Sequence, residues 1–122
     1  MNTITVTGNL AAAPELRYDK NNKPYTFARV LVTDRVRQND GTFVDGGTIG
    51  YDAAVWGSDA EGLVQTALDS GNIRVTVSGD YLVELYQPEG GEPRLTHRIL
   101  DAEVSVSFRG QSITVEKRSA AE

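Results

Sequence analysis

Cysteine is absent from this 122-residue chain, and histidine, tryptophan and methionine each occur once. Without cysteine the chain can form no disulfide, thiolate metal site or thiol nucleophile. No Ser–His–Asp triad can be assembled around the one histidine, His97, and no phosphate loop, dinucleotide fingerprint or zinc-ligand spacing is present. Because Leu95 and Ile99 share its strand face, we expect His97 to be a packed or hydrogen-bonded imidazole. We therefore expect a protein that is not an enzyme, with no catalytic residues, no metal site and no cofactor.

Long apolar runs are also missing. No stretch approaches the roughly 20 apolar residues that span a bilayer, and the N-terminus has no basic segment followed by an apolar one. A chain of this length suits one domain, which can bury a core without disulfides or metal. We expect a soluble, cytoplasmic protein with no membrane partner.

Charge is distributed unevenly along the chain. The formal net charge of −5 argues at first against a polyanionic partner. However, residues 1–38 carry +3, residues 39–93 carry −9 with a single arginine, and residues 94–122 carry +1. Most cationic side chains therefore come from two separate segments, which the fold could bring together.

Alternation of apolar and polar residues predicts five strands, at residues 3–10, 25–37, 48–56, 72–86 and 94–108. A helical spacing replaces this pattern in "SDAEGLVQTALDSG", residues 58–71. Its apolar positions are Ala60, Leu63, Val64, Ala67 and Leu68. Ser58 and Glu61 form a capping-box pattern at its start, and Gly71 suits its end. We expect this helix to pack on the core and to do no chemistry.

Three strands, a helix and two strands are the layout of an OB-fold barrel. We therefore predict an all-β domain over residues 1–109, a five-stranded OB-fold barrel with one α-helix between the third and fourth strands. Residues 110–122 form a short C-terminal extension in this interpretation.

The second predicted strand, "FARVLVTDRVR", has an outward face that suits a nucleic-acid strand. Alternation places one ring, one aliphatic side chain, one hydroxyl and three guanidinium groups on this face. These residues are Phe27, Arg29, Leu31, Thr33, Arg35 and Arg37. Rings stack on bases, and guanidinium groups bind phosphates. The alternative is a solvated face on which Phe27 and Leu31 pack under a loop.

Trp56 and Tyr86 are further candidate binding side chains. Trp56 lies on the strand face opposite Tyr51, Ala53 and Val55, which have the pattern of core residues, and Tyr86 closes the fourth predicted strand. Exposed rings on neighbouring strands are typical stacking platforms, although they also occur in subunit interfaces.

Several motifs, taken in order, resemble the bacterial single-stranded DNA-binding protein family. "TVTGNLAAAPELRY" resembles the family's opening, "RVLVT" its second strand and "DGTFVDG" the loop that follows. "AAVWG", an amphipathic helix and "VTVSG" resemble its third strand to fourth strand. "DAEVSVSFR" resembles the fifth strand of actinobacterial members. The resemblance covers about residues 1–109, and the order and spacing of the motifs make it specific.

The resemblance implies an OB fold assembled as a homotetramer, or as a dimer. It implies sequence-independent binding of single-stranded DNA in replication, recombination and repair, at the nucleoid. By position, Trp56 and Tyr86 fall at base-stacking rings, and Phe43 falls in the loop between the second and third strands. The expected DNA-binding residues are Trp56, Tyr86, Arg29, Phe27, Thr33, Arg35, Arg37 and Phe43. The expected subunit contacts are Thr3, Thr5, Thr7 and Tyr51.

The chain departs from the family pattern at several positions. Stacking rings expected near Val36 and just before Tyr51, at Gly50, are absent, and Leu82 and Glu84 stand where arginine is common. Each lost phosphate contact or stack weakens binding, so we expect weaker single-strand binding than in a housekeeping member. The Gly/Pro/Gln-rich linker and acidic tip of the family are also missing, so protein partners recruited by that tip are not expected.

Two functions stay open on these observations. Trp56, Tyr86 and the arginine row favour single-stranded DNA binding. Asp52, Glu84 and the acidic middle segment favour a divergent OB-fold oligomer that acts as a protein-interaction or structural module, with weak or no DNA binding.

Overall fold

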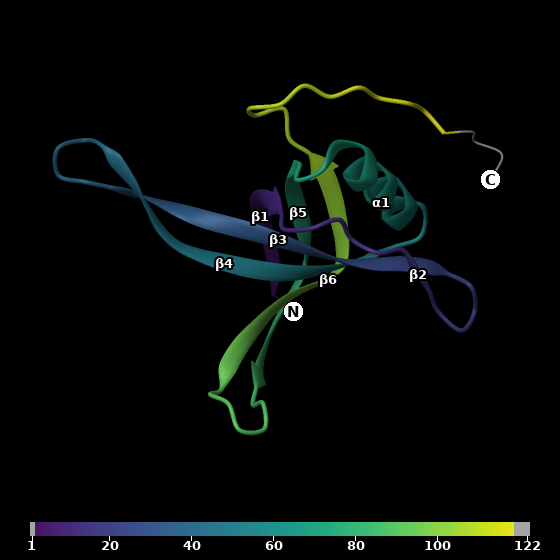
Figure 1. Ribbon diagram of the computed structural model, residues 1–122, viewed down its shortest axis with the longest axis horizontal. Helices are drawn as coiled ribbons and strands as arrows, with labels where there is room; N and C mark the ends of the chain where they lie inside the picture. Colours follow the sequence, from purple (N-terminus) through teal and green to yellow (C-terminus); the bar gives the residue numbers. More distant parts are fainter. Residues whose placement is uncertain (1, 119–122) are drawn as a thin grey trace.

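The computed structural model describes residues 2–118 and contains one helix and six strands (Figure 1). The strands are β1 (Thr3–Leu10), β2 (Arg17–Tyr18), β3 (Pro24–Arg37), β4 (Phe43–Trp56), β5 (Arg74–Tyr86) and β6 (Arg94–Val106), and the helix α1 spans Ser58–Ser70. The five long strands and the helix follow the predicted order. The two-residue strand β2 was not predicted.

The strands form one sheet in the order β1-β5-β6-β4-β3-β2, and β1 also pairs with β3. This second pairing places Asn9 opposite Leu31 and Leu10 opposite Val30. It closes the sheet into a barrel and confirms the predicted five-stranded OB-fold layout. Gly8 permits the closure, because a Cβ there would collide with the carbonyl oxygen of Leu31.

The barrel core is built from the inward residues of the long strands. The largest fully buried apolar side chains are Leu10, Val30, Val55, Val75, Val77 and Ile99. Thr26 is equally buried, and its hydroxyl donates to the carbonyl oxygen of Glu15 at 2.7 Å, so its polar group is satisfied. Phe27 and Leu31 face outward, with 45% and 37% of their surface exposed, as the alternation predicted.

The helix α1 packs on the barrel through one stripe of small and aliphatic residues. The buried members are Ala60, Leu63, Val64 and Ala67, as predicted. Leu68 was predicted on the same stripe, but it is 66% exposed, because it lies at the margin of the stripe that Ala67 continues. No helix within residues 2–118 is long and apolar enough to cross a membrane.

The two ends of α1 differ in how well the sequence predicted them. The prediction of a capping box at Ser58 and Glu61 is wrong: Gly57 is the N-cap residue, and no side-chain hydrogen bond caps this end. Glu61 instead pairs with Arg118, at 3.4 Å. Gly71 ends the helix as predicted, with a φ of +79° and its N–H donating to the carbonyl oxygen of Ala67.

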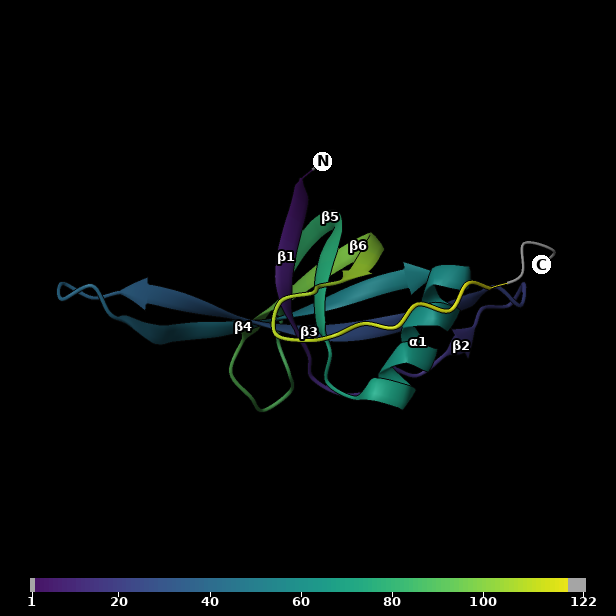
Figure 2. The ribbon, with the colours of Figure 1, turned by 90° about the horizontal axis from the view of Figure 1, so that it is seen from above.

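The β3–β4 hairpin extends beyond the barrel as a long arm (Figures 1 and 2). β4 begins at Phe43, whereas the sequence predicted a start at Thr48. Phe43 therefore lies on a strand, opposite Arg37, and not in the predicted loop. The pairing of this hairpin is irregular between Thr33 and Arg35, which separates the arm from the barrel part of the two strands.

After β6 the chain runs back past α1 (Figure 1). The amide of Gln111 bonds both backbone groups of Arg74: Nε2 donates to its carbonyl oxygen at 2.9 Å, and Oε1 accepts from its N–H at 3.1 Å. Arg118 donates to the carbonyl oxygen of Ser58 at 2.9 Å. These contacts attach residues 110–118 to the barrel. The rest of the predicted extension, residues 119–122, lies outside the described residues, and the division at residue 109 stays a prediction.

Candidate nucleic-acid interface

A row of aromatic rings lies on the outward face of β3 and β4. Tyr25 packs between the other two rings, with its centroid 5.7 Å from that of Phe27 and 5.0 Å from that of Trp56. Trp56 is 36% exposed and Phe27 45%, so both rings present surface to solvent, as predicted. Sequence reasoning missed Tyr25, although its spacing of two from Phe27 places it on the same face.

A cation lies over each exposed ring that the sequence singled out on the barrel. The Nζ of Lys23 is 5.2 Å from the centroid of Trp56, and the Cζ of Arg98 is 5.7 Å from that of Phe27. The Cζ of Arg94 is 5.1 Å from the ring of Tyr86. Sequence reasoning named none of these three cations. Stacked rings and positive charge thus occur together, as a nucleotide requires.

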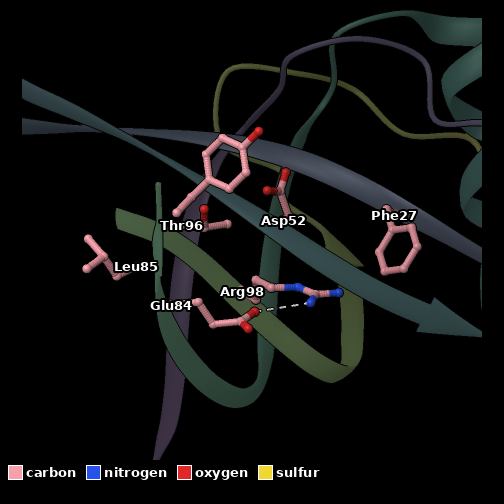
Figure 3. A pocket seen from close by; sticks show the side chains of 7 residues that line it. Phe27, Asp52, Glu84, Leu85, Thr96 and Arg98 are labelled. Atoms are coloured by element: carbon pink, nitrogen blue, oxygen red, sulfur yellow. Dashed lines mark hydrogen bonds and ion pairs between the residues drawn. The ribbon is translucent and has the colours of Figure 1, made fainter. Parts of the chain in front are cut away.

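Phe27 and Tyr86 line one hollow of about 340 Å³ on the outward face of the sheet. Figure 3 shows this hollow, with Arg98 pointing towards Phe27 across it. Glu84 accepts a hydrogen bond from the Arg98 guanidinium at 3.2 Å. Trp56 lines another hollow with Lys23 and three carboxylates, those of Asp19, Asp59 and Asp101. The fold therefore brings predicted residues of β3 and β5 together with unpredicted cations.

Arg29 lies over Gly50, the position at which the family resemblance predicted an aromatic ring. A Cβ added to Gly50 would collide with the Arg29 guanidinium, so this side chain lies directly over the glycine. The guanidinium also donates to Asp52 at 3.1 Å, and the two side chains are 55% and 31% exposed. An exposed ion pair contributes only about 0–1 kcal/mol, so Asp52 holds Arg29 weakly.

The remaining predicted binding residues lie further along the β3–β4 arm. Thr33 shares a hydrogen bond of 2.8 Å with Thr48, and Arg35 pairs with Asp45 at 3.4 Å. Arg37 and Phe43 stand opposite one another at the far end, and Phe43 is 53% exposed. None of these residues lines the hollow of Phe27 and Tyr86.

The residues predicted as subunit contacts occupy two different environments. Thr5 and Thr7 bond across the β1–β5 pair, to Ser78 at 2.5 Å and to Thr76 at 2.9 Å, and Thr3 is exposed at the start of β1. Tyr51 is only 8% exposed and belongs to the core of the protomer. Subunit contact by these residues stays a prediction.

Tyr51, Tyr81 and His97 form a packed group beneath the outward face. The Tyr81 hydroxyl lies 2.7 Å from Nδ1 of His97, and their rings stack at 6.0 Å, so the prediction of a packed, hydrogen-bonded imidazole is confirmed. Burial raises the pKa of Tyr51, and Tyr81 and Asp34 raise it further. Within residues 2–118 no group of histidine and carboxylate side chains is arranged to hold a metal ion.

Residues 1–107 match the model of the single-strand binding protein family. The chain belongs to this family. Relatives in the family include the single-stranded DNA-binding protein of Paenarthrobacter aurescens, which is 32% identical over 117 residues, covering 94% of this chain and 67% of that protein. The protein of the same name from Mycobacterium tuberculosis is 29% identical over 118 residues, covering 96% and 71%. These actinobacterial relatives agree with the resemblance found in the motifs.

Solved structures of family proteins have the same fold. The crystal structure of a small single-stranded DNA-binding protein from Streptomyces coelicolor matches with a TM-score of 0.73 at 24% identity, covering 88% of this chain and 94% of that chain. Plasmodium falciparum SSB in complex with ssDNA matches with a TM-score of 0.61 at 14% identity, covering 88% and 95%. The predicted OB-fold is thereby confirmed.

Proposed function

We propose that this chain binds single-stranded DNA without sequence preference and does no catalysis. The observation that carries the proposal is the set of exposed rings on the outward sheet face, Phe27, Trp56 and Tyr86, each with a cation over it. Every base has a face on which a ring can stack, so such a surface accepts any sequence. Membership in the family, and the names of its relatives, support the same function.

In this proposal the arginines supply the phosphate contacts. Arg29 and Arg98 stand beside the rings, and each is held by one partly exposed carboxylate, Asp52 or Glu84. A phosphate group of the bound strand displaces that carboxylate, since exposed pairs of this kind are weak. The same carboxylates repel the strand, so we infer weaker binding than a more basic face would give.

We further propose that the protein acts as a homo-oligomer, with a tetramer as the expected state. Within the described residues β1 pairs with β3 only at Asn9 and Leu10, so from Thr3 to Gly8 one edge of β1 has no strand beside it. An open edge of this length invites a second strand. We infer that β1 of a second subunit pairs there, and that the assembly protects DNA during replication, recombination and repair in the cytoplasm.

Titration with oligo-dT tests the proposal, with fluorescence of the single tryptophan, Trp56, as the signal. We expect quenching at about 50 mM salt and clear weakening at about 200 mM, because binding releases counterions. Labelled oligo-dT followed by anisotropy should bind more weakly to both Trp56→Ala and Arg29→Ala.

Arg118→Ala is the matched control for Arg29→Ala. Arg118 is also a partly exposed arginine paired with a carboxylate, but it contacts α1 and not the rings. The affinity of the Arg118→Ala variant for oligo-dT should equal that of the wild type. Absence of binding at about 50 mM salt, with the oligomer intact by light scattering, would instead establish the structural or protein-interaction module.

A further inference from the structure

A third hollow, a groove of about 350 Å³, lies where β1 crosses β3. Residues 7–9 of β1 form one wall, and Thr33 and Arg35 of β3 form part of another. Arg74 of β5 and Arg109, from the segment after β6, complete the groove. Three arginines from distant parts of the sequence thus surround one hollow.

The groove is cationic although the chain as a whole is acidic. Asp45 is the one carboxylate in its lining, and it pairs with Arg35 at 3.4 Å. Three arginines against one aspartate leave a net charge of +2. Arg74 is the single basic residue among residues 39–93, which otherwise carry ten carboxylates. The acidic segment therefore contributes its one cation to this groove.

Arg74 and Arg109 both line the groove, and the segment that carries Arg109 is bonded to the backbone of Arg74. Gln111 bonds both backbone groups of Arg74, and the N–H of Ser107 donates to the same carbonyl oxygen at 3.0 Å. Within residues 2–118 neither Arg74 nor Arg109 has a salt-bridge partner. The buried Nε of Arg74 has no hydrogen-bond partner there. Because neither guanidinium is paired with a carboxylate, an anion in the groove can bind them without first displacing one.

The lining of the groove indicates which anion it suits. It contains no aromatic ring, so it offers bases nothing to stack on. It continues the outward row of β3, since Leu31, Thr33 and Arg35 belong to both. A strand that stacks on Phe27 and follows β3 therefore reaches this groove with its sugar–phosphate backbone.

We propose that this groove is a second phosphate-binding track, in which Arg74 and Arg109 bind the backbone of the same DNA strand. The proposal rests on the function proposed above and extends it. The bases are held at the rings. The track adds sequence-independent contacts where β3 lies beside β1. Residue Arg109 belongs to this site although it lies beyond the family match.

The test compares the salt dependence of oligo-dT binding among variants. Each phosphate contact on a single strand contributes about 0.7 to the slope of log K against log salt. Arg109→Ala and Arg74→Gln should each lower the slope by about 0.7, and the double variant by about 1.4. Arg109→Lys should restore the slope, because lysine retains the charge. Arg118→Ala, with the same charge change in the same extension, should leave it unchanged.

The outcomes separate this proposal from the one it rests on. If wild-type protein binds oligo-dT and quenches Trp56 but all variants keep the wild-type slope, the track is overturned and DNA binding at the rings stands. If the wild type does not bind oligo-dT, both fail. Calorimetry with inorganic phosphate gives a third arm: heat that is lost in the double variant, with slopes unchanged, would assign the groove to a free anion and overturn the track. Thermal melting checks that each variant is folded. If Arg74→Gln does not fold, the salt slope of Arg109→Ala decides the test, because Arg109 is exposed.

Discussion

The guanidinium of Arg98 lies over the ring of Phe27, with its Cζ 5.7 Å from the ring centroid. The two residues belong to β6 and β3, which are separated in the sheet by β4. The parallel pairing of β4 with β6 places Arg98 beside Asp52, and from there the Arg98 guanidinium reaches the Phe27 ring. A base-stacking ring and a phosphate-binding group are thereby placed within reach of one nucleotide.

Replacing Phe27 with alanine should weaken oligo-dT binding by about 1–3 kcal/mol, because one stacking ring is lost. The slope of the salt dependence should stay unchanged, because no charge is removed. Titration of labelled oligo-dT at several salt concentrations measures both quantities. Phe27→Trp keeps a ring and should bind like the wild type. Equal affinity of Phe27→Ala and the wild type would remove Phe27 from the interface.

Glu84→Gln should tighten binding of oligo-dT. The change removes the carboxylate that pairs with Arg98 at 3.2 Å and leaves a side chain of the same shape. Arg98 then binds phosphate without first losing a partner, and the salt slope should steepen by up to about 0.7. Glu103→Gln is the control, because Glu103 is an exposed residue of β6 that lies opposite Ser78, away from the hollow. If both variants gain equally, the effect is one of net charge and not of the pair.

Leu63→Ala and Leu68→Ala should differ sharply in their effect on stability. Leu63 is 7% exposed on the buried stripe of α1, whereas Leu68 is 66% exposed. The first substitution leaves a cavity and should lower the free energy of unfolding by about 2–5 kcal/mol. The second should change it by less than about 0.5 kcal/mol. Urea denaturation measures both, and similar losses would place Leu68 in the core.

Local periodicity predicted the elements well, because each strand face is decided by its own alternation. The outward row of β3 and the buried face of α1 both followed from spacing alone. The start of β4 did not, because Asp45, Gly46 and Gly47 interrupt the apolar pattern there, and pairing with β3 carries the strand through them. The capping box failed because Gly57 takes the N-cap position and Glu61 turns to Arg118.

The candidate site was harder to predict, because it depends on which strands become neighbours. Phe27, Trp56 and Tyr86 could be named as exposed rings from alternation within their own strands. Arg98 and Arg94 could not be matched to rings, since their partners lie on other strands. The distribution of charge along the chain was informative. Most cationic side chains come from residues 1–38 and 94–122, and residues of both segments lie together on the outward face.

Alkaline pH should lower the stability of the wild type more than that of Tyr51→Phe. Burial, with Tyr81 and Asp34 nearby, raises the pKa of Tyr51 in the folded protein. Above about pH 10 the unfolded chain releases the Tyr51 proton while the folded chain keeps it, so the free energy of unfolding falls as pH rises. Below about pH 10 this group contributes no pH dependence. In urea denaturation from pH 8 to pH 11, the free energy of unfolding should therefore fall more steeply for the wild type than for Tyr51→Phe. An equal fall in the two proteins would contradict the prediction.

The hydrogen bonds of Gln111 and Arg118 determine where the C-terminus of this protein can be truncated. The family match stops at residue 107, but Gln111 satisfies the N–H and the carbonyl group of Arg74, and Arg118 reaches the first turn of α1. A fragment cut at the family boundary would lose both bonds of Gln111 and leave the N–H of Arg74 without this acceptor. The smallest fragment that keeps both sets of contacts therefore runs through Arg118, and a fusion partner joined there would emerge beside α1.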